Sequence, residues 1–158
     1  MLKVTLSSSV SRRSVHLGLP VVLVIVVAGA AFFAWGPAPA SQVETGRRLY
    51  AEACAACHGA SLEGQPNWQR RLPNGRMPAP PHDASGHTWH HSDEVLFRIT
   101  KDGPAAYPEG YRTDMPAFGQ RLTDQEILAT LAFIKSTWPS EIRAKQERIA
   151  VDSRRRKP

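Results

Sequence analysis

The sequence predicts an all-α fold in which three main helices and two long loops follow one N-terminal transmembrane helix. Three observations support this expectation. Residues 17–36 hold no charged side chain. After residue 42, three stretches repeat apolar residues at helical spacing, and the segments between them are rich in Gly and Pro without sustained periodicity. No stretch shows the alternating pattern of a strand.

The N-terminal segment predicts a membrane anchor. Residues 1–16 carry three basic residues and no acid, which favours a cytoplasmic location. Residues 17–36 would span about 30 Å as a helix, the thickness of a bilayer's hydrocarbon core. A cleaved signal peptide is the alternative, because Ala38 and Ala40 suit a signal peptidase. Either way, the rest of the chain is expected in the periplasm, with a retained anchor making a single pass through the inner membrane.

The net charge of +6 is concentrated at the two ends of the chain. Residues 41–139 hold ten basic and eleven acidic residues, whereas residues 140–158 hold seven basic and three acidic ones. The central part is therefore nearly neutral and offers no evident basic face for a phosphate backbone. We expect no nucleic-acid partner.

Residues 37–42 are expected to be a Pro- and Ala-rich linker, and residues 43–139 one domain. The expected helices cover about 43–56, 93–100 and 124–138. Ser92 can cap the second helix, which Gly103 would close. Thr123 and Glu126 stand at capping-box spacing ahead of the third helix.

The two predicted loops, residues 59–81 and 103–122, are long for a domain of this size. Structureless loops beyond about 12–15 residues are unusual in a compact domain unless they have a function of their own. The three short helices also offer few large apolar side chains, and small domains often complete their core with a disulfide, a metal or a cofactor. The sequence therefore predicts that the loops enclose a further group.

The stretch Cys54-Ala55-Ala56-Cys57-His58 has the C-x-x-C-H pattern of c-type haem attachment. Two thiols at this spacing can each add across one porphyrin vinyl group, and the following histidine can offer a nitrogen to the iron. A zinc site normally needs four ligands, and the chain has no third cysteine. A thioredoxin-like dithiol would follow a strand, which this sequence lacks. We expect one covalently bound haem c.

From about residue 43 to residue 138 the chain resembles the class I cytochrome c family, in its small membrane-anchored bacterial monohaem form. The motifs that match are GRRLYAEACAACHG, DMPAFGQRLTDQEI and LAFIKSTW. The resemblance implies a cytochrome c fold around the haem, with His58 and Met115 as the axial ligands of the iron. It also implies that Gly46 packs against Phe133, with Tyr50 beside them.

Alternatives remain for two of these roles. Met77 or a histidine could replace Met115 as the distal ligand, and the distal site could be open. A thioether would favour ferrous iron relative to a second imidazole. The resemblance also implies a proline carbonyl that accepts a hydrogen bond from the proximal imidazole. We expect Pro81 in that role, with Pro80 next and Pro66, Pro73 and Pro78 as further alternatives.

Four histidines lie within ten residues ahead of the second helix: His82, His87, His90 and His91. Their short spacing allows a second metal site, with copper or zinc as the candidates. The alternative that we favour gives them structural or haem-propionate roles, with Trp89 packing near the haem.

Residues 140–158 are polar and basic, which predicts a solvated helix that frays into a charged tail. The alternative is an electrostatic contact with anionic lipid or an acidic redox partner. The whole chain is expected to transfer single electrons between redox partner proteins, alone or within a larger oxidoreductase. It is not expected to be an enzyme, because no acid-base or nucleophilic group of residues is evident. A haem or metal sensor with a labile distal ligand is the alternative function.

Overall fold

The computed structural model describes residues 39–156, which belong to one compact unit, Ala38–Pro158. The predicted cytoplasmic segment 1–16 and the predicted anchor 17–36 lie outside the described residues. No helix within residues 39–156 is long and apolar enough to cross a bilayer.

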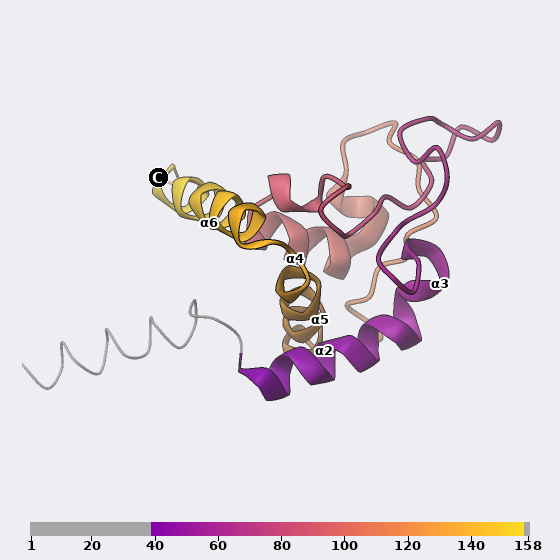
Figure 1. Cartoon of the computed structure of the whole chain (residues 1–158). Coiled ribbons are helices and arrows are strands. Elements are labelled where there is room, and N and C mark those ends of the chain that lie inside the picture. The colour runs from indigo at the N-terminus through magenta and orange to yellow at the C-terminus, as the bar shows by residue number, and fades with distance from the viewer. Residues whose placement is uncertain (1–38, 157–158) are drawn as a thin grey trace, which may run out of the picture. The chain divides into compact units, whose positions relative to one another are not determined.

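The described part of the chain is helical, which confirms the predicted all-α class for this region. Its α-helices are α2 (Ala40–Ala53), α3 (Ala55–His58), α4 (Asp93–Asp102), α5 (Asp124–Ser136) and α6 (Ser140–Arg155), and its 3₁₀ helices are η1 (Thr88–His90) and η2 (Gly103–Ala106) (Figure 1). Residues 39–156 contain no strand, and the one bridge among them joins Met77 to Thr113.

The first predicted helix differs from the observed one at both ends. Helix α2 begins at Ala40, inside the predicted linker, directly after Pro39. Proline fixes its own φ and so favours a position at a helix start. The helix is then interrupted at Cys54, and α3 adds one short turn that ends at His58.

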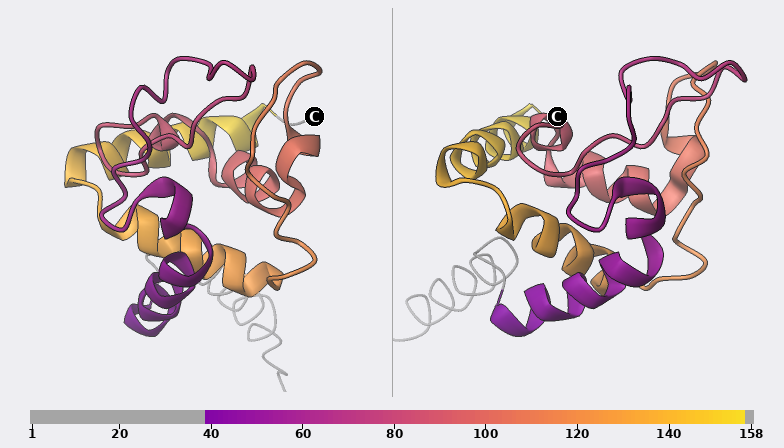
Figure 2. Two further views of the ribbon diagram at one scale, coloured as in Figure 1. Left: turned by 90° about the vertical axis from the view of Figure 1, so that its right-hand side faces the viewer. Right: turned by 45° about the vertical axis from the view of Figure 1, so that its right-hand side comes forward.

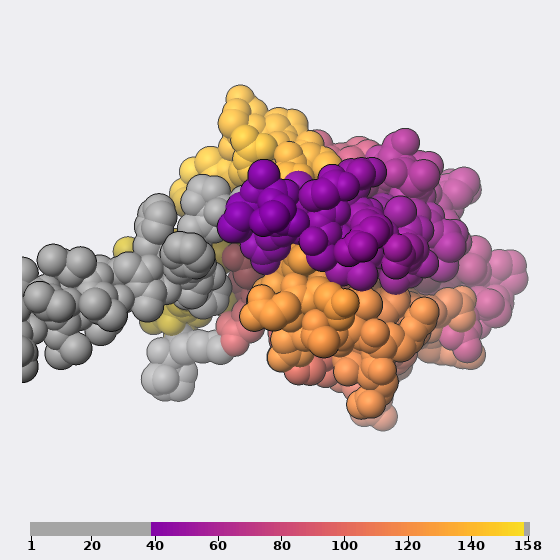
Figure 3. Space-filling view, turned by 90° about the horizontal axis from the view of Figure 1, so that it is seen from below, coloured from indigo at the N-terminus to yellow at the C-terminus, as the bar shows by residue number. Residues whose placement is uncertain are grey.

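Helices α2 and α5 cross so closely that only a glycine fits between them. A Cβ atom on Gly46 would lie 1.9 Å from the carbonyl oxygen of Ala129 and 3.0 Å from Cβ of Phe133. The rings of Tyr50 and Phe133 are 5.4 Å apart beside this crossing. In the space-filling view of Figure 3, the indigo atoms of the α2 segment lie directly against orange atoms of the chain, in keeping with the close packing of α2 on α5. The predicted packing of Gly46 against Phe133 is confirmed.

The predicted caps of α4 and α5 are confirmed. The Ser92 side chain accepts a hydrogen bond from the backbone N–H of Val95, at 3.4 Å. Thr123 and Glu126 form a complete capping box at the start of α5. These caps satisfy backbone N–H groups that a helix start leaves without an intrahelical partner.

The hydrophobic core is small and comes from segments far apart in the sequence. Its buried members are Tyr50, Leu62, Leu96, Ile127, Leu131, Ile134 and Trp138. Leu62 alone comes from the first long loop. That loop and the loop before α5 run beside each other at one end of the domain (Figure 2).

Helix α6 occupies the segment predicted to be a solvated helix and tail. The helix is present, but one side of it is buried, because Gln146 is fully buried and Ala150 is nearly so. Ile142 packs against the core, and the helix contacts η1. The expectation of a wholly solvated helix is therefore wrong for this side of α6.

Candidate functional site

The two cysteines lie at the junction of α2 and α3 and form no disulfide with each other. Cys54 is half-buried and Cys57 is exposed. Burial raises the pKa of the Cys54 thiol to about 11, with a smaller contribution from Cys57. Dithiol redox chemistry needs a thiolate with a lowered pKa. The raised pKa of Cys54 is therefore unlike that of a dithiol oxidoreductase.

His58 is buried and its orientation is set by one hydrogen bond. Its Nδ1 lies 2.9 Å from the carbonyl oxygen of Pro80. A carbonyl can only accept, so Nδ1 carries the hydrogen and Nε2 keeps its lone pair. Burial lowers the pKa of His58, while the bond to Pro80 opposes this shift. The imidazole is thus held in the neutral form that binds metals.

The prediction that Pro81 accepts this hydrogen bond is wrong, because the acceptor is Pro80. Pro81 is buried beside two glycines: a Cβ on Gly64 would lie 2.4 Å from its nitrogen, and one on Gly86 2.0 Å from its oxygen. Its carbonyl accepts instead from the Thr88 hydroxyl, at 3.3 Å. Carbonyls of neighbouring residues in an extended chain point to different sides, so only one of the two can face His58.

The four clustered histidines separate into different environments. His82 stacks on His58, with ring centroids 4.0 Å apart and 20° between the planes. His87 lies between Trp68 and His91, with ring centroids 5.0 and 5.5 Å away. Among residues 39–156, no group of three or more His, Cys, Asp or Glu side chains could hold a metal ion.

Trp89 lies in η1 and packs against the edge of the core. Its ring stacks on His90 at 3.6 Å, and Lys145 Nζ from α6 lies 5.6 Å from its ring centroid. Its Nε1 is buried and has no hydrogen-bond partner within the described residues. A buried N–H group without an acceptor costs about 1–3 kcal/mol, so this position suits a ligand that brings an acceptor oxygen.

Met115 is half-buried in the loop before α5, and its neighbours are tied to the other long loop. The Met115 N–H donates to Oγ1 of Thr113, at 3.1 Å. Arg76 donates to the Thr113 carbonyl at 2.9 Å and pairs with Asp114 at 2.7 Å. The Met77 N–H donates to the carbonyl of Arg112 at 2.8 Å. These bonds bring the segments of both candidate methionines side by side.

Gln146 is a residue whose role the sequence analysis missed. Its Nε2 donates to Oδ1 of Asp93 at 2.7 Å and to the carbonyl of His91 at 3.3 Å. Asp93 also accepts from Lys135, at 2.6 Å. These bonds fasten α6 to the start of α4. The available signal was the four-residue spacing of Ile142, Gln146 and Ala150, which places them on one side of a helix.

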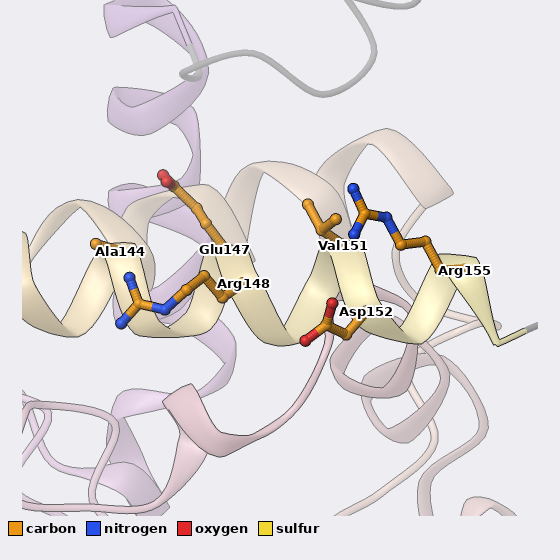
Figure 4. A pocket seen from close by; sticks show the side chains of 6 residues that line it. All are labelled: Ala144, Glu147, Arg148, Val151, Asp152 and Arg155. Atoms are coloured by element: carbon orange, nitrogen blue, oxygen red, sulfur yellow. The ribbon is translucent and has the colours of Figure 1, made fainter.

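The outer side of α6 carries a shallow depression that shares no residue with this site. Figure 4 shows the six side chains that line it, all of them on α6: Ala144, Glu147, Arg148, Val151, Asp152 and Arg155. A depression lined by one helix has no opposing wall, whereas small-molecule sites are concave and enclosing. We assign it no ligand.

The residues at the α2–α3 junction fit a covalently attached haem. Cys54 and Cys57 are not joined in a disulfide, and His58 presents Nε2 with its lone pair. The buried Nε1 of Trp89 is a donor that still needs an acceptor. The loops that would enclose such a group contribute few residues to the core: Leu62 in the main cluster, Leu122 packed against it, and the buried Phe118.

A family model described as Cytochrome c matches residues 43–138, which is more than half of the chain. Neither the curated proteins nor the solved structures include a significant match to the chain. The matched range contains both cysteines and Met115 and ends at Trp138, before α6 begins.

Proposed function

Because the chain belongs to the cytochrome c family, in which a covalently attached haem c carries electrons, we propose that it is a membrane-anchored monohaem carrier in the periplasm. It would pass single electrons between redox partner proteins. When bound, the haem supplies a one-electron couple between ferrous and ferric iron. The residues of the chain hold the haem, provide the ligands of the iron and limit the access of water to the iron.

The observation that carries this proposal is the hydrogen bond from His58 Nδ1 to Pro80. It leaves Nε2 free to coordinate iron and fixes the direction in which that atom points. Cys54 and Cys57 have the spacing for two thioether bonds, each made by adding an S–H group across a vinyl group, with no further reactant. His58 is the proximal ligand in this proposal.

Met115 is the proposed distal ligand. The family resemblance supports it, and so does the hold on its loop, since Arg76 bonds to both Thr113 and Asp114. A thioether ligand is soft and neutral and stabilises the ferrous state relative to a second imidazole. Met77 is the alternative ligand, because its segment pairs with Thr113.

Optical spectroscopy of the oxidised protein tests the distal ligand. The wild-type protein is expected to show the weak near-infrared charge-transfer band of iron–thioether coordination. Met115→Ala should lose this band, and Met77→Leu should keep it. A wild-type protein that is high-spin and binds carbon monoxide fully without denaturant would instead support a sensor with a labile distal ligand.

The proposed location rests on the N-terminal sequence. Residues 17–36 are uncharged and long enough for a bilayer, and the positive charges that precede them favour the cytoplasm. Mass spectrometry of protein purified from membranes should give a mass that retains these residues. Protease added to spheroplasts should remove the haem domain, whereas protection of the domain would contradict a periplasmic location.

A further inference from the structure

We propose that His82 is a positioning residue for His58, and that residues 80–82, here called the 80–82 strap, hold the proximal imidazole by two separate contacts. Pro80 accepts a hydrogen bond from the edge of the His58 ring at 2.9 Å. His82 covers the flat face of the same ring at 4.0 Å. The inference rests on the proposed role of His58 as an iron ligand.

The two contacts restrict different motions of His58. A hydrogen bond to Nδ1 lies in the plane of the ring and favours one angle for that edge. A stacked ring lies against the face and resists tilting out of that plane. Either contact alone would leave the other motion open. Together they define the orientation of the plane in which Nε2 lies.

His82 can act in this way because its own side chain is held. Its Nδ1 lies 2.8 Å from Oγ1 of Thr88. The Thr88 hydroxyl donates its one hydrogen to the carbonyl of Pro81, so it accepts from His82 Nδ1–H. These two hydrogen bonds fix the angle of the His82 ring against His58.

The backbone of the 80–82 strap is held from both sides. The Trp138 indole donates to the carbonyl of His82 at 2.7 Å, which connects the strap to the residues that follow α5. The N–H of His82 donates to the carbonyl of Leu62 at 2.8 Å. Gly64 and Gly86 approach Pro81 too closely for any side chain. The packed core thus fixes the position of the His82 backbone relative to the His58 ring.

Two variants of His82 separate the stacked ring from the hydrogen bond. His82→Phe keeps a flat ring and loses the donor to Thr88, whereas His82→Asn loses the ring and keeps an amide N–H near the position of Nδ1. The haem-loaded full chain is compared by electron paramagnetic resonance and by its reduction potential. The g values of low-spin ferric iron report how the axial ligands are oriented.

We expect His82→Phe to keep the wild-type g values and potential. In His82→Asn the g values should shift and broaden, and the potential should fall, because the space left by the ring admits water that stabilises the more charged ferric state. His87→Asn is the matched control. This residue stacks on Trp68 rather than on His58, so its variant should match the wild type.

Several results would overturn the inference. One is a His82→Asn variant with the g values and reduction potential of the wild type. Another is an equal shift of these quantities in His82→Phe and His82→Asn. The third is a His82→Phe variant that shifts them or fails to load haem while His82→Asn does not. If His82→Asn yields no haem-loaded protein, His82→Leu replaces it, with the same expectation of a shift. Failure of the proposed function would instead be seen in the wild-type spectrum, before any variant of His82 is compared.

Discussion

The segments that carry the two proposed iron ligands are held in different ways. The 80–82 strap is surrounded by the core, and buried or half-buried groups such as Thr88 and Trp138 bond to it. The segment before Met115 is held by Arg76 and Asp114, whose side chains are 37% and 67% exposed. Exposed ion pairs contribute about 0–1 kcal/mol, so the second segment is the more weakly held of the two.

This difference indicates which of the two proposed iron ligands is easier to displace. Displacing His58 would require opening packed backbone at Gly64 and Gly86. On the N-terminal side of Met115, displacement would break polar contacts that water can replace, whereas Pro116 and Ala117 on its other side pack closely on Gly103. We therefore expect exchange of the distal ligand to be easier than any movement of the proximal one.

The largest expected effect on stability comes from a comparison of two glycines with similar φ angles. Gly64 packs against the 80–82 strap, and Gly110 lies in the segment before Met115. Gly64 and Gly110 have φ values of +69° and +79°. A Cβ on Gly64 would lie 2.4 Å from the Pro81 nitrogen, whereas nothing lies within 4 Å of one on Gly110. Gly110→Ala should cost about 1 kcal/mol for its left-handed backbone, and Gly64→Ala about 3 kcal/mol because overpacking is added.

Guanidinium denaturation of the two alanine variants measures this difference. The midpoint should fall clearly further for Gly64→Ala than for Gly110→Ala. Equal losses would show that the 80–82 strap can move away from Gly64 at little cost, and the contrast between the two segments would then be wrong.

An intermediate effect is expected from Arg76→Ala, which removes the bonds to Thr113 and Asp114. The variant should lose about 1 kcal/mol of the free energy that holds the Met115 segment in place. Because replacing Met115 then costs less, imidazole should bind in its place roughly fivefold more tightly. Arg47→Ala is the control, because it removes an exposed ion pair with Glu44 on α2. Optical titration with imidazole should distinguish the two variants, and identical affinities would contradict the prediction.

The smallest effect is expected where the distal loop ends at α5. Hydrogen bonds from the Thr123 N–H and hydroxyl lower the pKa of Glu126. A lowered folded-state pKa means that the contribution is complete above the unfolded value of about 4.3 and is lost as pH falls through the folded value. Urea midpoints of the wild type and Glu126→Gln should therefore differ at pH 6 and converge in acid. A constant difference would contradict this.

Much of the helical structure could be predicted because its signals are local. Ser92, Thr123 and Glu126 cap their helices through atoms only a few residues away, and a capping pattern can be read directly from the sequence. The side of α6 that contains Gln146 was missed, because a buried polar residue looks like a solvated one until its partner is known. That partner, Asp93, is 53 residues away.

The sequence by itself determined the all-helical class of residues 39–156 and the C-x-x-C-H arrangement of Cys54, Cys57 and His58, because spacing within one or two helical turns sets these features. Only the tertiary structure decided that Pro80 rather than Pro81 meets His58, and that His82 covers the ring. The direction of a carbonyl and the face of a ring depend on how a loop is packed. Here that packing comes from Gly64, Gly86 and Trp138, whose contacts with the strap span 17 to 56 residues or lie across a turn that no periodicity marks.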